Sequence, residues 1–325
     1  MTVRVHDGAA PMKVLLTGAG GQLGQALLAS RPEGVELLPL RRSDLDLADA
    51  DACRQLVRQH QPDWLLNAGA YTAVDRAEGE PELAMAVNGG APQAFAEALA
   101  ETGGRLLQVS TDFVFNGQQG SPYRPEQAPE PLGVYGASKA AGERAVLAAL
   151  GPGRARILRT SWVYGPVGAN FCLTMLRLHA LKAAAGEPLA VVADQVGCPT
   201  ASSGLAAACW RAIGIGADPG APTILHWSDA GAASWYDFAV AIGELGVAAG
   251  VLEHAARVRP IPTSAYPTPA ARPAYSLLDC GASRAALGLE PTHWRTALAQ
   301  VLGQLAALRT PDRSPLPCAK PLTEA

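Results

Sequence analysis

The sequence predicts an α/β fold: a parallel sheet with helices on both faces, followed by a smaller α/β lobe. Three observations point to it. Short apolar runs alternate with helical patterns from Lys13 onward, these runs carry no polar face, and a glycine-rich turn joins the first run to the first helix. Segments that are apolar on both faces and are linked by helices are typical of a parallel sheet that is covered on each side.

The first half of the chain supplies the strands and helices of this sheet in alternation. The apolar runs predict strands at residues 14–16, 35–38, 64–66, 105–109 and 156–159. The periodic segments between them predict helices at residues 23–28, 50–58 and 92–101, and one more around Lys139. The third helix has Pro92 in its first turn and is followed by Gly103 and Gly104, which indicate a helix start and a helix stop.

The composition of the chain changes near residues 162–168, where glycine, proline and aromatic residues become frequent and the hydrophobic periodicity weakens. Beyond this point, helical patterns at 171–182, 201–213 and 235–246 alternate with extended segments at 189–192 and 223–225. A long irregular segment follows, marked by prolines 260, 262, 267, 269 and 273. We therefore expect a sheet domain at 12–164, a smaller lobe made mainly of 165–309 with some segments returning to the sheet, and flexible tails at 1–11 and 310–325.

The composition describes a globular chain with a substantial core and excludes several classes of function. Of the 325 residues, 49% are hydrophobic and 17% are charged, and the formal net charge is -3. The basic residues are scattered, so we expect no nucleic-acid partner, and no apolar run is long enough to predict a membrane span. The six cysteines show no metal-binding spacing and are typical of a reducing compartment, which predicts a cytoplasmic protein. Residues 1–11 lack the apolar stretch of a signal peptide, so either Met1 or Met12 can be the true start.

A glycine-rich turn, Gly18-Ala-Gly-Gly21-Gln-Leu-Gly24, lies between the first expected strand and the first expected helix. In this context, glycines let the chain turn tightly and let backbone N–H groups approach the diphosphate of a dinucleotide at the start of the helix. The turn therefore predicts a Rossmann doubly wound sheet that binds NADP(H) within residues 12–164. The cofactor contacts expected from the turn are Gly18, Gly20, Gly21, Gln22, Leu23 and Gly24.

Further cofactor contacts are expected where the second and third strands end. Sites for NADH usually carry an acidic residue about 20 residues after the turn, but this chain has Arg41 and Arg42 there. An arginine suits the 2′-phosphate of NADPH, so Arg41 predicts a preference for NADPH, and NADH stays open if the side chain is only solvated. The remaining expected contacts are Asp46 and Leu47 beside the adenine, and Ala68, Gly69 and Ala70 beside the ribose and diphosphate.

Tyr135 and Lys139 stand one helical turn apart, a spacing that places both side chains on one face of a helix. Reduction of a ketone requires an acid that protonates the oxygen while a nicotinamide cofactor gives hydride to the carbon. We expect Tyr135 to be that acid, with its pKa lowered by the Lys139 ammonium and by the oxidised nicotinamide. We also expect both Tyr135 and Lys139 to contact the cofactor, with Lys139 hydrogen-bonded to the nicotinamide ribose.

Thr111 and Asp112 follow the fourth expected strand, at the carboxyl edge of the sheet where ligands bind in this fold. The Thr111 hydroxyl is suited to bind the same substrate oxygen as Tyr135. Asp112 can accept from sugar hydroxyls or can form a turn, and the sequence leaves both roles open. Trp162 follows the fifth strand, where a tryptophan is either a core residue or a ligand contact.

These motifs resemble the extended short-chain dehydrogenase/reductase superfamily and, within it, the dTDP-4-dehydrorhamnose reductase family. The similarity spans about residues 13–302, and the segment Asp194-Gln-Val-Gly-Cys-Pro-Thr200 is particularly specific. The other segments that carry the resemblance are the glycine turn, Asn67-Ala-Gly-Ala-Tyr-Thr-Ala-Val-Asp75, Ser110-Thr-Asp-Phe-Val-Phe115, Tyr135-Gly-Ala-Ser-Lys139, Arg159-Thr-Ser-Trp-Val-Tyr164, Asn170-Phe171 and Arg272-Pro273.

The resemblance implies an enzyme that reduces the 4-keto group of dTDP-4-dehydro-β-L-rhamnose with NADPH to give dTDP-L-rhamnose, for the biosynthesis of cell-surface polysaccharide. It also implies that Thr111, Tyr135 and Lys139 form the catalytic trio, that Asp112 and Trp162 contact the nucleotide-sugar substrate, and that the second lobe mainly binds substrate.

The resemblance leaves two properties open and shows two departures. Some relatives dimerise through a magnesium ion held by carboxylates, so Mg2+ and a homodimer stay open, although we match no residue here to those positions and assign no metal ligand. The family usually has tyrosine where this chain has Phe113, and alanine where it has Gly69. The loss of the hydroxyl at position 113 does not affect the expected acid.

Two other activities stay open on the sequence. A sugar-nucleotide 4-epimerase or 4,6-dehydratase shares the glycine turn and the tyrosine–lysine pair. Dehydratases resemble one another in having Asp-Glu directly after the threonine, whereas here Asp112 is followed by Phe113. The regulatory subunit of methionine adenosyltransferase is similar in fold and acts by binding a partner, and fold alone does not exclude that role.

Overall fold

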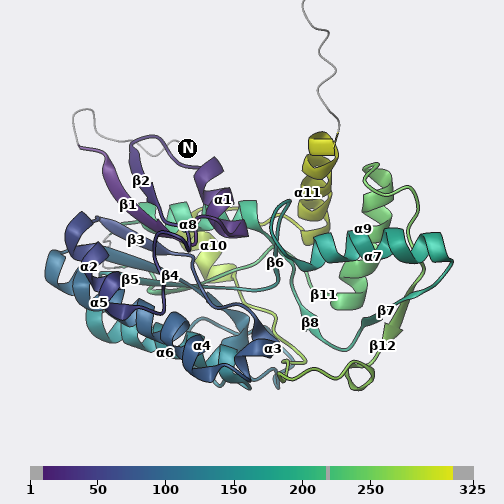
Figure 1. Cartoon of the computed structure of the whole chain (residues 1–325), viewed down its shortest axis with the longest axis horizontal. Coiled ribbons are helices and arrows are strands. Elements are labelled where there is room, and N and C mark those ends of the chain that lie inside the picture. Colours follow the sequence, from purple (N-terminus) through teal and green to yellow (C-terminus); the bar gives the residue numbers. More distant parts are fainter. Residues whose placement is uncertain (1–9, 217–219, 310–325) are drawn as a thin grey trace, which may run out of the picture.

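The computed structural model describes residues 10–216 and 220–309, and its centre is a six-stranded parallel sheet (Figure 1). The strands are β1 (Met12–Thr17), β2 (Val35–Pro39), β3 (Trp64–Asn67), β4 (Arg105–Thr111), β5 (Ala155–Thr160) and β10 (Ile224–Trp227). They lie in the order β10-β5-β4-β3-β1-β2, and neighbouring strands are parallel. The chain direction across the sheet reverses at β1, with β2 on one side and β3 on the other, and such a reversal is where ligands bind in this architecture.

Helices cover both faces of the sheet, because alternate residues of each strand are apolar on opposite sides. Val14 and Leu16 of β1 pack into one core and Leu15 packs into the other. The first core includes residues of α1 (Gln22–Ala29), α8 (Ser202–Gly214) and α10 (Gly281–Leu287), and the second includes residues of α2 (Ala50–His60), α5 (Ala91–Thr102) and α6 (Val134–Leu150). Figure 1 shows α5 and α6 along one side of the sheet and α1 and α8 along the other, which confirms the expected doubly wound fold.

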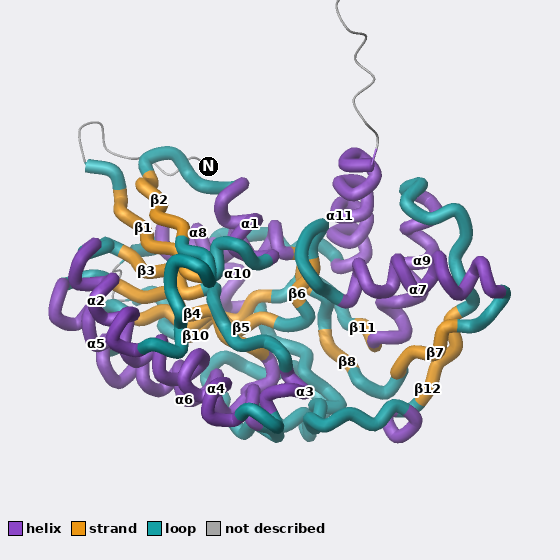
Figure 2. Tube along the Cα trace, in the orientation of Figure 1, coloured by secondary structure: helices purple, strands orange, loops and turns teal. Residues whose placement is uncertain are grey.

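A smaller lobe is built on α7 (Phe171–Ala185), α9 (Trp235–Ala248) and α11 (Trp294–Arg309). Short strands pair within it and at its border: β6 (Val163–Tyr164) with β9 (Thr200–Ala201), β8 (Val196–Gly197) with β11 (Ala233–Ser234), and β7 (Leu189–Val192) with β12 (Val258–Ile261). Figure 2 shows these strands as short segments between helices and loops, apart from the main sheet. The core of the lobe includes Tyr164, Phe238 and Leu298, which are fully buried.

The second half of the chain contributes to both parts of the molecule. The extended segment expected at 223–225 is β10, which pairs with β5 at the edge of the main sheet. The helix expected at 201–213 is α8, which packs on the sheet through Leu205 and Ile213. The sequence patterns did not predict α10, α11 or β6, β8, β9 and β11, and the two residues in each of these strands are too few to show a period. Apart from residues 10 and 11, the expected tails lie outside the described residues.

The helix expected at 92–101 is α5, and a further helical segment directly precedes it. A helical segment starts at α4 (Pro81–Met85), passes through a π-helical turn, η1 (Ala86–Gly90), and continues as α5. The residues at both junctions have right-handed helical dihedral angles, so Pro92 lies inside a continuous helical segment. The predicted helix with Pro92 in its first turn is therefore confirmed, and the π-helical turn that directly precedes it, which the sequence did not predict, extends the helical segment toward the N-terminus.

The described part of the chain contains no helix that is both long enough and apolar enough to cross a bilayer. Within the same residues, five cysteines are free and buried, at positions 53, 172, 198, 209 and 280.

Candidate active site

The glycine turn connects β1 to α1 and is closely packed. Gly18 has a φ of 68°, in the left-handed region that favours glycine. A Cβ atom at Gly18 would lie 2.7 Å from Gly69 N, and one at Gly24 would lie 2.2 Å from the Gly18 oxygen. No side chain caps the first N–H groups of α1, which begins at Gln22. Free N–H groups beside a tight glycine turn suit a diphosphate, so these residues fit a dinucleotide.

A cavity of about 590 Å³ lies at the outer side of this turn. Its lining consists of Ala19, Gly20, Gln25, Leu28, Ala29 and Arg41. Arg41 follows β2 closely and is exposed, and a Cβ atom at Gly20 would lie 4.0 Å from its Cγ. Arg42 does not line the cavity. Of the two arginines, Arg41 is therefore the one that the fold brings to the turn.

Gln22 and Leu23 differ in what they offer a cofactor. The Leu23 side chain is 8% exposed within the sheet core, so its backbone is the part that a ligand can reach. Gln22 accepts from Asn170 Nδ2 over 2.9 Å and donates to the Ala169 carbonyl over 3.3 Å. These bonds join the glycine turn to the start of α7 in the lobe.

The other expected cofactor contacts lie where β2 and β3 lead away from the sheet edge. The segment 68–70 follows β3 and is partly exposed. A Cβ atom at Gly69 would lie 2.7 Å from Leu47 Cδ1, so Leu47 packs against this segment. Asp46 accepts the Ala48 N–H over 3.0 Å and thereby forms a local turn. Contact between Asp46 and the adenine stays a prediction.

Tyr135 and Lys139 lie on α6, and Thr111 is the last residue of β4. Lys139 is 5% exposed, and its Nζ donates to the Val109 carbonyl over 2.7 Å. Tyr135 is partly exposed and interacts with the Thr111 hydroxyl. The fold therefore brings the three residues expected to carry the chemistry to one edge of the sheet.

The acid–base properties of this pair differ from the expectation. Burial raises the pKa of Tyr135 to about 12, and the Thr111 hydroxyl opposes this shift while the Asp112 charge adds to it. Burial lowers the pKa of Lys139 to about 8, and the Glu143 charge opposes this shift. The expectation that Lys139 makes the phenol acidic is thus not met by the protein's own groups. At neutral pH Tyr135 keeps its proton, which is the form that a proton donor needs.

The Thr111 hydroxyl lies between Asp112 and Tyr135. Its Oγ1 donates to Asp112 Oδ1 over 3.0 Å and accepts from the Phe113 N–H over 3.2 Å. Asp112 is 1% exposed, and burial raises its pKa to about 6, with the hydroxyls of Ser276 and Thr111 opposing. The observed role of Asp112 is to orient Thr111, and its direct contact with substrate stays a prediction.

Gly136 and Phe113 explain how α6 approaches the end of β4. A Cβ atom at Gly136 would lie 2.2 Å from the Phe113 carbonyl oxygen, so glycine lets α6 contact the 3-10 turn η2 (Asp112–Val114). The Phe113 ring meets the Tyr135 ring edge to face, with centroids 5.6 Å apart. Phe113 therefore supports the tyrosine by packing, which does not require a hydroxyl at this position.

A chain of buried hydrogen bonds runs along the sheet edge from β1 to Lys139. Thr17 Oγ1 donates to Asn67 Oδ1 over 2.5 Å, and Asn67 Nδ2 donates to Gln108 Oε1 over 2.7 Å. Gln108 Nε2 donates over 2.8 Å to the Val109 carbonyl, which also accepts from Lys139. Sequence reasoning missed Gln108, whose signal was a lone amide inside an apolar strand. Side chains from β1, β3 and β4 thus fix the carbonyl that holds the lysine.

Asn88, in the π-helical turn η1, is another functional candidate that sequence reasoning missed. It is 2% exposed, its Oδ1 accepts the Tyr71 N–H over 2.9 Å, and its Nδ2 donates to Ser138 Oγ over 3.1 Å. Ser138 Oγ in turn donates to the Tyr135 carbonyl over 2.8 Å. Asn88 therefore ties the loop after β3 to the helix that carries Tyr135. The available signal was a polar residue within a helix just before two glycines and a proline.

Trp162 lies at the same edge of the sheet. Thr160, at the end of β5, pairs in register with Thr111, and Trp162 follows it by two residues. The indole is partly exposed and stacks on Trp235 of the lobe. Contact between Trp162 and a substrate stays a prediction.

Among residues 10–216 and 220–309, no group of three or more His, Cys, Asp or Glu side chains is arranged to hold a metal ion. The magnesium ion that the resemblance leaves open therefore gains no ligand set from the described residues.

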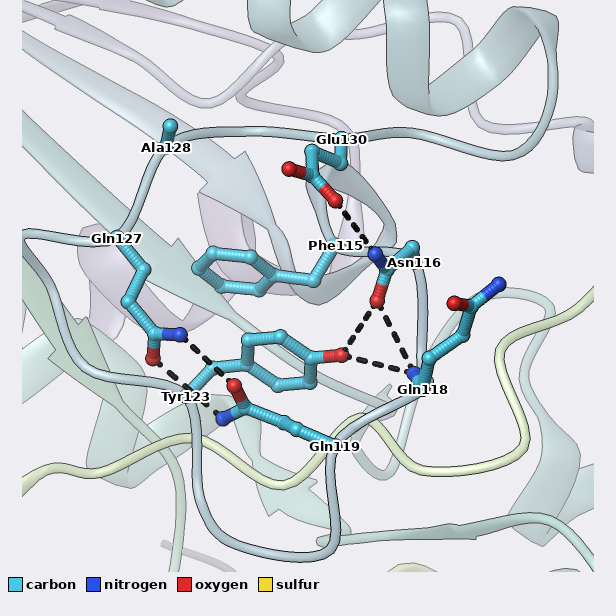
Figure 3. Close-up of a pocket in the computed structure, with 8 residues that line it drawn as sticks. All are labelled: Phe115, Asn116, Gln118, Gln119, Tyr123, Gln127, Ala128 and Glu130. Atoms are coloured by element: carbon cyan, nitrogen blue, oxygen red, sulfur yellow. Dashed lines mark hydrogen bonds between the residues drawn. The ribbon is translucent and has the colours of Figure 1, made fainter.

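A second cavity, of about 340 Å³, belongs to the loop between η2 and α6 (Figure 3). Its polar side chains bond to one another: Gln127 Nε2 donates to Gln119 Oε1 over 2.8 Å, and Tyr123 Oη donates to Asn116 Oδ1 over 2.8 Å. Asn116 Nδ2 donates in addition to Glu130 over 2.5 Å. These reciprocal bonds hold the loop together, and we assign the cavity no ligand.

Comparison with known proteins agrees with this site. A family model described as the RmlD substrate binding domain matches residues 12–307. The chain is 41% identical over 296 residues to a dTDP-4-dehydrorhamnose reductase from Aggregatibacter actinomycetemcomitans, covering 89% of this chain and 98% of that protein. It is 44% identical over 292 residues to another from Streptomyces griseus, covering 88% and 91%.

A solved structure extends the comparison to three dimensions. The dTDP-4-dehydrorhamnose reductase from Bacillus anthracis str. Ames, in complex with NADP, matches with a TM-score of 0.80 at 32% identity, covering 90% of this chain and 99% of that chain. The similarity thus includes the sheet, the glycine turn and the lobe. The chain belongs to the RmlD substrate binding domain family.

Proposed function

We propose that this chain is an NADPH-dependent oxidoreductase that reduces the 4-keto group of dTDP-4-dehydro-β-L-rhamnose to give dTDP-L-rhamnose. The observation that carries the proposal is the meeting of Thr111, Tyr135 and Lys139 at the sheet edge, beside a glycine turn that fits a dinucleotide. Relatives that share about 40% of the sequence over nearly their whole length carry the name of this activity.

In the proposed reaction, Tyr135 donates its proton to the carbonyl oxygen, and the C=O bond becomes a CH–OH group. NADPH, when bound, supplies the hydride that adds to carbon. The phenol suits this direction of reaction, because its pKa of about 12 keeps it protonated at neutral pH. Thr111 interacts with the phenol through its hydroxyl, and the Lys139 ammonium, on the same helix, is assigned to hold the nicotinamide ribose beside Tyr135.

We further propose a preference for NADPH over NADH. Arg41 lines the cavity beside the glycine turn, where its guanidinium is suited to pair with a 2′-phosphate. The Arg41 side chain is exposed, so pairing it with a phosphate requires little loss of hydration. Leu47 packs against the loop after β3.

Two general properties stay proposals as well. The free, buried cysteines fit a reducing compartment such as the cytoplasm. A homodimer is compatible with the family, and sedimentation equilibrium across a range of protein concentrations tests it directly.

The alternative activities are separable by experiment. An epimerase would retain NAD as a recycled cofactor, which an absorbance spectrum of the purified protein would reveal. A 4,6-dehydratase would need a second acid after Asp112, where this chain has Phe113 packed on Tyr135. A regulatory subunit would co-purify with a synthetase and would oxidise no NADPH.

The direct test monitors NADPH oxidation with dTDP-4-dehydro-6-deoxy-L-mannose and with its UDP-linked analogue, and identifies the product sugar by NMR. We expect oxidation with the dTDP-linked substrate and formation of dTDP-L-rhamnose. Absence of oxidation with both substrates would leave the family assignment in place and remove the proposed activity.

A further inference from the structure

Trp162 and Trp235 stack face to face at the border between the sheet and the lobe. Their ring centroids are 3.5 Å apart and their planes differ by 7°. Trp162 follows β5, whereas Trp235 is the first residue of α9. Phe171, the first residue of α7, also packs against Trp235, with a centroid distance of 4.6 Å. The stack therefore joins the end of the sheet to both of these helices of the lobe.

The second face of the Trp162 ring lies on Gly197. A Cβ atom at position 197 would lie 2.7 Å from Trp162 Cε2 and 2.9 Å from both Cζ2 and Nε1. An indole stacked 3.5 Å away leaves no space for another group on its side, so Gly197 contacts the opposite face. The ring is thus held between Trp235 and a backbone that only glycine permits.

The backbone of Trp162 is also constrained. Its φ is 45°, a left-handed conformation that bulky residues keep only where the surrounding structure holds them. The Trp162 carbonyl accepts the Thr200 N–H over 3.2 Å, and Ser161 Oγ donates to the Cys198 carbonyl over 2.8 Å. Residues 197–200 therefore hold both the ring and the backbone of Trp162.

The adjoining residues hold Trp235. Gln195 Oε1 accepts from Trp235 Nε1 over 3.2 Å, and Gln195 Nε2 donates to Thr263 Oγ1 over 3.1 Å. Asp194 accepts from the Thr263 N–H over 2.9 Å and from the Thr263 hydroxyl over 2.6 Å. These contacts give a physical role to the segment Asp194-Gln-Val-Gly-Cys-Pro-Thr200, which the proposed reaction does not use.

The stack adjoins the proposed reaction site. Trp162 follows by two residues the strand end that pairs with Thr111. Figure 1 shows β6, which begins immediately after Trp162, between the main sheet and the helices of the lobe. Trp162 therefore stands where a large substrate whose reacting carbon is at Thr111 extends toward the lobe.

We propose that Trp235, Gln195 and Gly197 are positioning residues that fix Trp162 as a rigid wall for the nucleotide sugar. This inference rests on the proposed function, because it takes a nucleotide sugar as the substrate. A wall that is already ordered loses less conformational entropy when the ligand binds. The wall reaches the glycine turn only indirectly, through Phe171 and its neighbour Asn170, which bonds Gln22, so its loss should act on affinity for the nucleotide sugar more than on cofactor binding.

The test compares Trp235→Ala and Trp235→Phe with a matched control, Trp210→Phe, whose indole packs on the main sheet from α8. We expect Trp235→Ala to raise the KM for dTDP-4-dehydro-6-deoxy-L-mannose about tenfold, as for loss of a preorganised contact. The kcat and the Kd for NADPH should stay within about twofold of wild type. Trp235→Phe should restore part of the affinity, and the control should leave all three constants unchanged.

A spectroscopic signature reports the stack independently of activity. Two parallel indoles in van der Waals contact couple their electronic transitions, so circular dichroism should show an exciton couplet in wild type and in Trp210→Phe. Both Trp235 variants should lose it. Gly197→Ala, which retains every indole, should alter the couplet and raise the KM for the sugar, because the added methyl displaces Trp162.

The outcomes separate this inference from the proposed function. A lost couplet with an unchanged sugar KM in Trp235→Ala overturns the inference and leaves the activity intact. A lower kcat, a higher KM for the sugar and weaker NADPH binding, all changed by similar factors, also overturn it, because they indicate a general folding defect. If wild type does not oxidise NADPH with the sugar, the proposed function fails. Calorimetry with dTDP-L-rhamnose then decides the inference, which falls if wild type and Trp235→Ala bind it equally or not at all.

Discussion

Lys139 is held by its burial and by the Val109 carbonyl, which also accepts from Gln108. Burial brings the pKa of the lysine to about 8, far enough down for it to titrate near neutral pH. The phenol of Tyr135 stays protonated well above that range. Among the three proposed catalytic residues, Lys139 therefore controls how the activity depends on pH.

We expect the rate of reduction at saturating substrates to fall by about tenfold per unit above pH 8. The sign follows from the charge: the ammonium holds the nicotinamide ribose in place for hydride transfer, and the neutral amine formed above the pKa of about 8 holds it less firmly. Lys139→Arg keeps its charge at higher pH and should move the decline upward, although its geometry differs. A wild-type profile that is flat to pH 10 would contradict this role.

The exposed Arg41 side chain gives a second prediction about a single residue. Arg41→Ala should raise the KM for NADPH by about tenfold and leave that for NADH unchanged, as expected for loss of one charged phosphate contact. Arg42→Ala is the matched control, because Arg42 is also exposed but does not line the cavity. Steady-state kinetics with both cofactors measures the effect. Equal changes for both cofactors would show that Arg41 does not contact the 2′-phosphate.

The sequence predicted the residues of the trio because their spacing and their places after strands are local features. Gln108 and Asn88 escaped prediction because their roles depend on partners from other strands and helices. The pKa of Tyr135 also could not be predicted, because it depends on how deeply the folded protein buries the phenol.

Close contacts between elements depend on small residues. Gly136 lets α6 contact η2, and Gly142 lets the same helix contact the π turn. A Cβ atom at Gly142 would lie 2.2 Å from the backbone carbonyl oxygen of Asn88. These contacts fix the position of α6 relative to the end of β4. The position of Tyr135 therefore depends on glycines that take no part in the chemistry.

The buried carboxyl of Asp229, which contacts the start of α8, gives a prediction about stability. The carboxylate accepts the Ala201 N–H over 3.0 Å, and burial raises its pKa to about 7. Its pKa in the unfolded chain is about 4, so between these values the folded state binds a proton that the unfolded state releases. The free energy of unfolding should therefore fall as pH rises from about 4 to 7, by an amount on the order of 2–4 kcal/mol.

Asp229→Asn keeps an oxygen for the Ala201 N–H and removes the titration. Thermal unfolding should show a higher Tm for the variant than for wild type at pH 8, and nearly equal values at pH 4.5. A variant that is less stable than wild type at pH 8 would show that the charged carboxylate is stabilising.

Helices and strands with a clear period could be predicted, and their bounds differ by few residues from those observed. The π turn before α5 could not be predicted, because the residues before it favour a continuing helix whereas Pro92 indicates a helix start. The short strands of the lobe border depend on pairing with distant segments, as β6 does with β9. Local pattern carries no information about such partners.

For the whole molecule, an ion pair between residues far apart in the sequence joins the proline-rich segment to the short helix α3 (Val74–Ala77), which follows β3. Arg272 Nη1 and Nη2 donate to Asp75 Oδ1 and Oδ2 over 2.9 and 2.8 Å. Asp75 also accepts the Ala270 N–H over 3.2 Å. Both residues belong to segments that carry the family resemblance, and the pair joins these segments in space.

A double-mutant cycle of Asp75→Asn and Arg272→Gln tests this pair. Both side chains are partly exposed, so we expect a coupling energy of only about 1 kcal/mol in chemical denaturation at pH 7. Hydrogen bonding to Arg272 lowers the pKa of Asp75, so the contribution is present above its unfolded pKa and is lost as pH falls through the folded one. A coupling below about 0.3 kcal/mol at pH 7 would mean that other contacts hold the segment.

The overall architecture followed from the alternation of strands and helices, whereas the arrangement of the lobe did not. The return of β10 to the sheet and the stacking of Trp162 on Trp235 join segments that lie far apart in the chain. Such contacts depend on three-dimensional packing, which a single sequence does not display.

The central claim is that Tyr135 delivers the proton in reduction of the keto sugar. Its most direct test is the rate of NADPH oxidation by Tyr135→Phe with dTDP-4-dehydro-6-deoxy-L-mannose, with the Kd for NADPH as control. Because the phenylalanine keeps the edge-to-face contact with Phe113, we predict unchanged cofactor binding and a fall in kcat of about 10³-fold. A variant that retains kcat within about threefold of wild type would contradict the claim.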